Sequence, residues 1–384
     1  MSAPTQTARA TVASEGREAA ARATVVPLGA LALGRRHESG APVMPPMPAA
    51  LVDGQRRAVR YLRLSVTDRC SYRCVYCMPE EGLAFTPRAE VLTYEEPIRL
   101  TRVFATLGVT RVRLTGGEPL LRRDVVRLVA GIAAIPEIDD VALSTNGHQL
   151  AELARPLADA GLTRVNVSLD SLDPARFERI TRTGALGRVL AGLEAAQAAG
   201  LGPIKLNTVV IGGHNDDELA GLVTFAAEHG YLPRFIEFMP IGVDGFWSDA
   251  SFVSTAQMMA RLARDFTLAP LGDFAKGEGV VGGGPARHAW LTPVRGGPPV
   301  QVGFVSALSH NFCSTCNRVR LTAVGTLQEC LAYPGSLSLR DRLRQGASDS
   351  DLAEVIADAL WGKSPGHRFV EGLATRQSMS ITGG

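Results

Sequence analysis

The spacing of hydrophobic positions changes in a regular way along residues 60–240. Short runs with a two-residue repeat, typical of strands, alternate with longer runs whose apolar positions recur every three or four residues, typical of helices. The repeat predicts strands at 61–66, 111–115, 140–145, 164–170, 204–210 and 234–239, and helices at 95–107, 122–135, 149–160, 186–199 and 216–229. Such an alternation with short connections indicates a parallel sheet, either open and doubly wound or closed as a barrel.

The polar positions within these strands favour the barrel. Parallel strands buried between two helix layers normally read as continuous apolar runs. Here Leu62 and Leu64 face away from Arg63, and the same alternation places Arg113 and Lys205 on the polar side of their strands. Helices must cover the apolar side, so the polar sides converge on a cavity. Unpaired buried charges are costly, which predicts a lumen that holds an anionic ligand; pairing with acidic lumen residues or an exposed sheet face are the alternatives.

Composition divides the chain into three parts. Residues 1–55 are rich in Ala, Pro and Arg without a sustained period, and we expect a disordered N-terminal extension; an overextended start site or an organellar transit segment are the alternatives. Residues 56–240 form the predicted partial barrel. Residues 241–384 form a loop-rich C-terminal region, with a helix near 255–265 and strands near 300–308.

Charge and hydropathy exclude several classes of partner. The 384 residues are 46% hydrophobic, enough for a large core, and the net charge of +2 offers no general attraction to nucleic acid or to an acidic membrane. No apolar run approaches the roughly 20 residues that a membrane helix needs. The N-terminal stretch lacks the features of a secretory signal, so we expect a cytoplasmic protein with reduced cysteines.

The six cysteines fall into two groups of three. The first cysteine group is a C-x3-C-x2-C loop of Cys70, Cys74 and Cys77, and the second cysteine group is a C-x2-C-x13-C pattern of Cys313, Cys316 and Cys330. Strand-like runs flank Val324-Gly325, and a hairpin there would put Cys330 opposite Val319, beside Cys316. All three thiols of the second cysteine group can therefore meet.

Three thiols in eight residues are typical of an iron–sulfur site rather than of disulfides. A four-iron cluster normally takes four cysteines, so three ligands leave one iron open to a substrate. Zinc would need a fourth Cys or His near the first cysteine group, and the closest downstream histidine is His148. At the second cysteine group His310 lies three residues before Cys313, so a Cys3His zinc site stays open there.

The motifs resemble those of known enzymes. The C-x3-C-x2-C loop with Tyr76 before its third cysteine, and "LTGGEP" at 114–119, resemble the radical S-adenosylmethionine (radical-SAM) superfamily. "YLRLSVTDRCSYRCVYC", "RVRLTGGEPLLRRD", "STNG", "VNVSLDSLD" and "FCSTCNRVRLT", in this order, are similar to the GTP 3',8-cyclase family of that superfamily. The resemblance runs from about residue 60 to the C-terminus.

This resemblance implies a fold and a reaction. The fold is α/β, an incomplete (β/α)6 TIM-like barrel with a C-terminal region closing the barrel mouth. The cofactors are two 4Fe–4S clusters and S-adenosyl-L-methionine. The reaction, catalysed by a radical SAM lyase, is cyclisation of GTP to (8S)-3',8-cyclo-7,8-dihydroguanosine 5'-triphosphate, the first step of molybdenum cofactor (molybdopterin) biosynthesis.

The resemblance also implies roles for individual residues. The two cysteine groups would each hold a 4Fe–4S cluster, and catalysis would rest on the first cysteine group with Arg318 and Arg320. The residues expected to contact S-adenosylmethionine are Tyr76, Gly117, Ser168 and Met239. The residues expected to contact GTP are Arg63, Arg113, Ser144, Lys205, Arg318 and Arg320, with Arg234 as a further candidate. Three of the GTP residues are the lumen cations that the strand pattern indicates by itself.

Two positions depart from the family pattern, and other functions stay open. Ser144 stands where the family has threonine, and Thr382 stands where an isoleucine is expected before the Gly383-Gly384 tail. The implied partners are GTP, cyclic pyranopterin monophosphate synthase as the next pathway enzyme, and an electron donor such as flavodoxin or ferredoxin, without nucleic acid or membrane; a homodimer is one compatible assembly. The alternatives are a radical-SAM peptide-modifying enzyme with an auxiliary cluster, or a non-enzymatic metal-binding module.

Overall fold

The computed structural model describes residues 51–242, 246–271, 284–371 and 378–383. Residues 1–50, which hold most of the predicted N-terminal extension, lie outside the described residues. The last residues assigned to that extension are described, and among them Leu51 and Asp53 are buried. The packed part of the chain therefore begins before residue 56.

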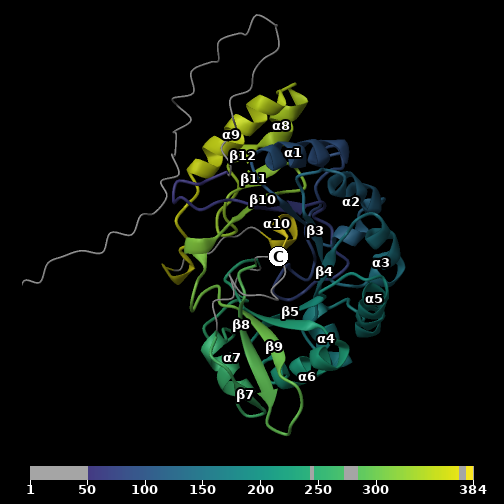
Figure 1. Ribbon diagram of the computed structural model, residues 1–384, viewed down its shortest axis with the longest axis vertical. Helices are drawn as coiled ribbons and strands as arrows, with labels where there is room; N and C mark the ends of the chain where they lie inside the picture. The colour runs from purple at the N-terminus through teal and green to yellow at the C-terminus, as the bar shows by residue number, and fades with distance from the viewer. Residues whose placement is uncertain (1–50, 243–245, 272–283, 372–377, 384) are drawn as a thin grey trace, which may run out of the picture. The chain divides into compact units, whose positions relative to one another are not determined.

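Six strand–helix units follow one another from residue 61, as the hydrophobic pattern predicts (Figure 1). The strands are β1 (Tyr61–Ser65), β2 (Arg111–Thr115), β3 (Asp140–Thr145), β4 (Arg164–Ser168), β5 (Lys205–Val210) and β6 (Leu232–Glu237). The helices are α1 (Glu95–Thr106), α2 (Val125–Ala133), α3 (Leu150–Asp159), α4 (Pro174–Thr181), α5 (Leu186–Ala198) and α6 (Leu219–His229). Sequence reasoning missed α4, which is only eight residues long although Asp173 caps it and Pro174 opens it.

The C-terminal region adds shorter elements. Its strands are β7 (Phe266–Leu268), β8 (Arg287–Pro293), β9 (Val300–Val305), β10 (Arg318–Leu321), β11 (Thr326–Gln328) and β12 (Leu337–Ser338). Its helices are α7 (Thr255–Leu262), α8 (Leu339–Arg344), α9 (Asp349–Trp361) and α10 (Met379–Thr382). None of the helices that the structure describes has the length and apolar character needed to cross a bilayer.

All twelve strands belong to one mostly parallel sheet in the order β12-β11-β10-β1-β2-β3-β4-β5-β6-β9-β8-β7. Two C-terminal strands continue the parallel part, because β10 pairs with β1 and β9 pairs with β6 in parallel. The α/β class with a parallel sheet is confirmed. The order has ends at β12 and β7, so closure of the barrel by the C-terminal region stays a prediction.

The parallel register places three arginines side by side. Arg63 on β1 is the partner of Arg113 on β2 and of Arg320 on β10. Neighbouring strands lie about 4.8 Å apart. The three arginines therefore lie side by side at one level of the sheet. We call these three residues the arginine row.

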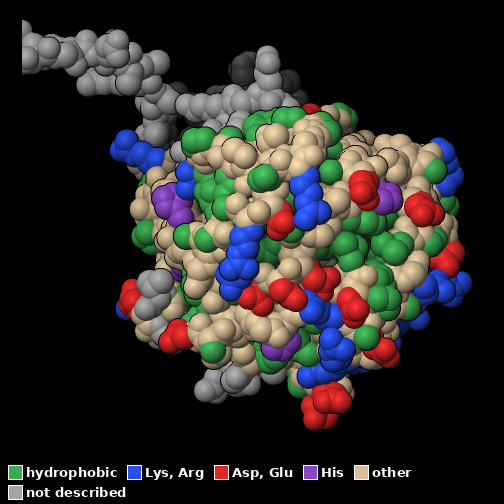
Figure 2. All heavy atoms as spheres, turned by 90° about the horizontal axis from the view of Figure 1, so that it is seen from below, with side chains coloured by type: hydrophobic (Ala, Val, Ile, Leu, Met, Phe, Trp, Pro, Cys, Tyr) green, Lys and Arg blue, Asp and Glu red, His purple; other side chains and the backbone are tan. Residues whose placement is uncertain are grey.

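The two faces of the strands differ as the alternation predicts. Leu62, Leu64, Val112 and Leu114 are at most 1% exposed, and in Figure 1 the helices α1 to α6 lie outside the strands. This agrees with the predicted burial of the apolar strand positions under the helices. On the outer face shown in Figure 2, acidic and basic side chains are interspersed, in keeping with the small net charge.

The C-terminal hairpin exists, but its register differs from the expected one. Antiparallel β10 and β11 pair Arg320 with Gln328 and Leu321 with Leu327. The turn therefore centres on Val324 instead of between Val324 and Gly325, and the same register continued would bring Cys330 opposite Arg318 rather than Val319. The Thr322 amide donates to the Thr326 carbonyl at 3.0 Å and the Gly325 amide donates to the Thr322 carbonyl at 2.9 Å, so residues 323–325 form the turn.

Candidate active site

The polar sides of the strands meet in one cavity with a strongly positive lining. The six residues that sequence reasoning assigned to GTP all line it, namely Arg63, Arg113, Ser144, Lys205, Arg318 and Arg320. Arg234 lines it as well, and so do the three thiols of the second cysteine group. We call it the basic cavity. The strand alternation therefore located Arg63, Arg113 and Lys205 correctly, and the prediction that they line a cavity is confirmed.

Burial among like charges lowers the pKa of three cations of the basic cavity, Arg63, Lys205 and Arg234. Burial first and Arg320 second hold the pKa of Arg63 well below its usual range. Burial, aided by Arg234, lowers the pKa of Lys205 to about 6, and burial with Arg113 lowers the pKa of Arg234 to about 9. A polyanion would relieve both effects, because it replaces lost hydration and separates the like charges.

Two further lining residues were missed from the sequence. Arg164 is 1% exposed, and its Nε donates to the Asp140 carboxylate at 3.0 Å. Its Nη1 has no hydrogen-bond partner among the described residues, so it is a further donor for an anion. Tyr61 accepts a hydrogen bond from Arg113 Nε and thereby orients that guanidinium. The two-residue repeat could have found both, because Tyr61 lies two positions before Arg63 and Arg164 lies four positions before Ser168, on the polar side of their strands.

The first cysteine group lies in the loop that follows β1, and its cysteines form no disulfide. Burial, then Glu118, raises the pKa of Cys70 to about 11, and burial, then Cys70, raises the pKa of Cys77 to about 12. Burial likewise raises the pKa of Cys74 well above its usual range, with further contributions from its charged neighbours. Such thiols ionise only beside a strong positive charge, which an iron–sulfur cluster supplies. Both other thiols contribute to the raised pKa of Cys74, so the three sulfurs lie near one another, as shared ligands of a 4Fe–4S cluster would need to.

The "GGEP" turn supports the first cysteine loop directly. A Cβ on Gly117 would lie 2.3 Å from the Arg69 carbonyl oxygen, and one on Gly116 would lie 2.4 Å from that of Thr67. The family resemblance implies that Gly117 contacts S-adenosylmethionine; in the structure the backbone before Cys70 approaches both glycines closely. Glu118 then accepts from the Thr145 hydroxyl at 2.7 Å. Burial outweighs such hydrogen bonds and raises the pKa of Glu118 to about 7.

The four residues predicted to contact S-adenosylmethionine do not all line the basic cavity. Met239 lines the basic cavity, whereas Tyr76, Gly117 and Ser168 are not among its lining residues. The Tyr76 hydroxyl donates to Asp170 at 2.7 Å. Ser168 ends β4 with an exposed side chain. Gly117 and Tyr76 therefore belong with the first cysteine loop, and Met239 belongs with the cations.

A C-terminal segment connects the first cysteine group with the arginine row. The Ser378 hydroxyl donates to the Cys77 carbonyl at 3.2 Å, and the Gly383 carbonyl accepts from Arg320 at 2.5 Å and from Arg63 at 3.5 Å. Figure 1 shows α10, which joins these two contacts, near the middle of the strands. Thr382 is buried despite its departure from the family pattern. Gly384 lies outside the described residues.

Two thiols of the second cysteine group, Cys313 and Cys316, have lowered pKa values, whereas burial raises the pKa of the third, Cys330. Burial acts to raise the pKa of Cys316, but Arg318 and Lys363 outweigh it and lower this pKa to about 7. Burial acts to raise the pKa of Cys313, but the imidazole of His367 outweighs this effect and lowers that pKa. His310, the histidine considered from the sequence, is exposed. Spacing along the chain could not find His367, because only the fold brings it to Cys313.

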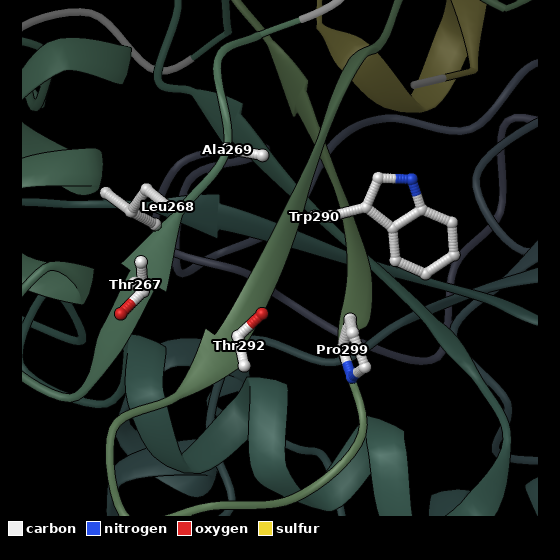
Figure 3. A pocket seen from close by; sticks show the side chains of 6 residues that line it. All are labelled: Thr267, Leu268, Ala269, Trp290, Thr292 and Pro299. Atoms are coloured by element: carbon white, nitrogen blue, oxygen red, sulfur yellow. The ribbon is translucent and has the colours of Figure 1, made fainter.

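A second hollow lies away from this chemistry. Figure 3 shows it on the strands β7 and β8, where Trp290 is 45% exposed beside Leu268 and Pro299. Neither cysteines nor cationic side chains line it. The reactive groups of the described chain therefore gather in and around the basic cavity.

Comparisons with known proteins agree with this arrangement. Residues 64–226 match the radical SAM superfamily, and residues 233–369 match the family Molybdenum Cofactor Synthesis C. GTP 3',8-cyclase of Pseudomonas entomophila (strain L48) is 47% identical over 341 residues, which cover 88% of this chain and 99% of the relative. GTP 3',8-cyclase 1 of Pseudomonas aeruginosa (strain PAO1) is 49% identical over 319 residues, covering 83% of this chain and 94% of the relative.

Solved structures show the same fold at low sequence identity. The crystal structure of Streptococcus suis SuiB has a TM-score of 0.54 at 14% identity, covering 86% of this chain and 78% of that one. SuiB bound to S-adenosylmethionine has a TM-score of 0.52 at 13% identity, covering 83% and 73%. At this identity the likeness establishes the fold alone.

The fold and the first cysteine loop define an enzyme of the radical-SAM class. Membership of that class implies S-adenosylmethionine and a 4Fe–4S cluster. Within it, the chain belongs to the GTP 3',8-cyclase family.

Proposed function

We propose that this chain cyclises GTP to (8S)-3',8-cyclo-7,8-dihydroguanosine 5'-triphosphate in the first step of molybdenum cofactor biosynthesis. The arginine row carries the proposal, because it gathers Arg63, Arg113 and Arg320 on one wall of a cavity that also holds Lys205. A triphosphate needs several positive charges, and arginine binds phosphate oxygens through two parallel hydrogen bonds. The names of the relatives agree with this substrate.

The cysteine groups would hold the cofactors. Cys70, Cys74 and Cys77 would hold one 4Fe–4S cluster, which together with S-adenosyl-L-methionine supplies a carbon radical able to remove a hydrogen atom from the substrate. The second cysteine group would hold another 4Fe–4S cluster beside Arg318 and Arg320. Tyr76, Gly117, Ser168 and Met239 would contact S-adenosylmethionine.

The residues of the protein itself would bind the substrates, orient them and enclose them. The arginine row, Lys205 and Arg234 would bind the triphosphate, while Arg318 lies at the start of β10 next to the second cysteine group. The segment 378–383 would separate the reacting atoms from water, since it lies between Cys77 and the arginine row. Holding two substrates at short range supplies much of the rate enhancement in such reactions.

We extend the proposal to domains and partners. A radical-SAM partial barrel at 56–240 and a C-terminal region at 241–384 with the second cluster and the Gly-Gly tail agree with the two family matches. The product would pass to cyclic pyranopterin monophosphate synthase. Flavodoxin or ferredoxin would supply the electrons in the cytoplasm. The enzyme itself would be a monomer or a homodimer.

Anaerobic incubation with GTP, S-adenosylmethionine and dithionite tests the function. We expect 5'-deoxyadenosine and a cyclised nucleotide in equal amounts, and GTP deuterated at C3' should transfer its label to 5'-deoxyadenosine. Formation of 5'-deoxyadenosine at the same rate without GTP, with no cyclised nucleotide, would overturn the substrate assignment.

Binding of GTP should take up a proton through Lys205. The pKa of about 6 leaves this amine mostly neutral at pH 7.5 in the free protein, and a bound phosphate would raise that pKa again. The affinity for GTP should therefore fall as pH rises above about 6, by up to tenfold per pH unit. Titration calorimetry in buffers of different ionisation enthalpy measures the uptake.

The matched variant is Lys205→Arg, which stays protonated throughout this range. At pH 7.5, GTP binding to this variant should take up close to one proton fewer than GTP binding to the unsubstituted protein. Protonation of GTP itself is common to both proteins and cancels. Equal uptake by the two would show that Lys205 is already charged in the free protein.

Docking of Gly383 should be required for turnover. A Cβ at this residue would lie 2.2 Å from the Thr115 hydroxyl and 2.9 Å from the Gly116 amide. Gly383→Ala should displace the segment and lower kcat roughly 10-fold, since small misplacements near reacting atoms are costly. The control is Gly346→Ala, which also has a positive φ, 90° against 70° at Gly383, but has open space around it. Equal kcat in both variants would contradict a role for the docked segment.

A further inference from the structure

Lys363 is a buried lysine that the reaction described so far does not use. It is one of three lysines in the chain and is 3% exposed. It follows α9, and its ammonium group donates to the Arg318 carbonyl at 2.6 Å. The same group lies 3.5 Å from the Cys316 carbonyl and 3.6 Å from the Cys316 sulfur. One cation thus contacts both a predicted cluster ligand and the backbone of a predicted GTP contact.

The segment that carries Lys363 is fixed from the other end of the chain. Arg57 donates to the Ser364 carbonyl at 2.8 Å, to the Pro365 carbonyl at 2.9 Å and to the Cys313 carbonyl at 2.7 Å. The buried Asp53 carboxylate accepts from Arg57 Nε at 2.7 Å and holds this guanidinium in place. The ammonium of Lys363 is therefore positioned by a rigid frame and not by a flexible loop.

The surroundings leave little freedom for another arrangement. A Cβ on Gly366 would lie 3.2 Å from the Cys313 Cβ, so the segment packs directly on the second cysteine group. A long lysine side chain normally keeps its charge in water. Burying that charge is tolerated here only because carbonyl oxygens and a sulfur surround it.

We propose that Lys363 is a positioning residue of the second iron–sulfur cluster: it holds Cys316 and Arg318 together and raises the reduction potential of the cluster. This inference rests on the proposed function, since it requires a cluster at the second cysteine group. Hydrogen bonds to cluster sulfurs and nearby positive charge set cluster potentials. A cation beside a thiolate ligand stabilises the reduced cluster, which carries one more negative charge.

Redox titration followed by electron paramagnetic resonance tests the proposal. The three residues of the first cysteine group are replaced by alanine, so that only the second cluster gives a signal. In this background Lys363→Met should shift the midpoint potential of the second cluster to a more negative value. Lys363→Arg, which retains the charge, should stay close to the unsubstituted value. An unchanged potential in Lys363→Met with full iron and sulfide content would overturn the proposal.

Further readouts separate the other outcomes. If Lys363→Met loses the second cluster while Lys363→Arg keeps it, the holding role is supported by the iron content itself. A potential that shifts equally in Lys363→Arg and Lys363→Met would assign the effect to packing and overturn the charge role. If the background protein without substitution at Lys363 contains zinc or no metal, the proposed second cluster is wrong, and this failure is visible before any Lys363 variant is compared.

Discussion

Replacing Cys74 with alanine is expected to abolish turnover, with a loss of at least about 1,000-fold, because the cofactor that carries the chemistry loses a ligand. Cys74 lies between Cys70 and Cys77 in the sequence of its loop, and both thiols help to raise its pKa, after burial and Asp170. The anaerobically reconstituted variant should contain about half the iron and sulfide of the unsubstituted protein. It should form no 5'-deoxyadenosine from S-adenosylmethionine with dithionite.

The matched control is Cys313→Ala, which removes a ligand of the second cysteine group. This variant should lose a similar amount of iron but still cleave S-adenosylmethionine, while failing to release cyclised nucleotide. The pair of variants separates radical generation from use of the substrate. Retention of full iron content by Cys74→Ala would contradict the assignment of the first cluster.

Replacing Arg63 with methionine should have opposite effects on stability and on activity. Arg63 is buried next to Arg320, and this surrounding lowers its pKa well below the usual range. Removing it should increase the free energy of unfolding by about 1–3 kcal/mol, as replacement of buried charge by apolar groups often does. It should also remove about 3 kcal/mol of charge-assisted binding, so kcat/KM for GTP should fall roughly 150-fold.

Thermal unfolding without and with GTP measures both effects in one experiment. Without GTP the variant should melt at a higher temperature than the unsubstituted protein, and GTP should stabilise it less. The control Arg127→Met removes an exposed arginine and should change neither quantity. A less stable Arg63→Met in the absence of GTP would show that Arg63 supports the fold rather than the ligand.

The sequence was sufficient for the six parallel strands and for the cations between them. The first five strands carry a two-residue repeat, and the helices α2 and α6 carry a three-to-four-residue repeat, so local patterning and burial agree. Arg63 and Lys205 stand out in this pattern because a charge alternates with buried aliphatic residues. Pattern alone was therefore enough to indicate a basic lumen.

The remainder depends on contacts between distant parts of the chain. No local repeat reveals that β10 pairs with β1, or that Arg57 and His367 reach Cys313. β8 was missed because Arg287 and His288 interrupt its apolar positions. The predicted hairpin register was wrong by one residue. Composition shows where a turn lies, but it does not distinguish a turn centred on a single residue from a turn centred between two residues.

The pairing of β10 with β1 has a consequence for how the enzyme is made. The third member of the arginine row lies on β10, which leaves the ribosome long after β1 has been synthesised. Until then the parallel sheet has an open edge at β1, and the basic cavity lacks one wall. Closing such a long loop is slow. Partial translation products that end before β10 should therefore lack the complete basic cavity, since Arg318 and Arg320 line it.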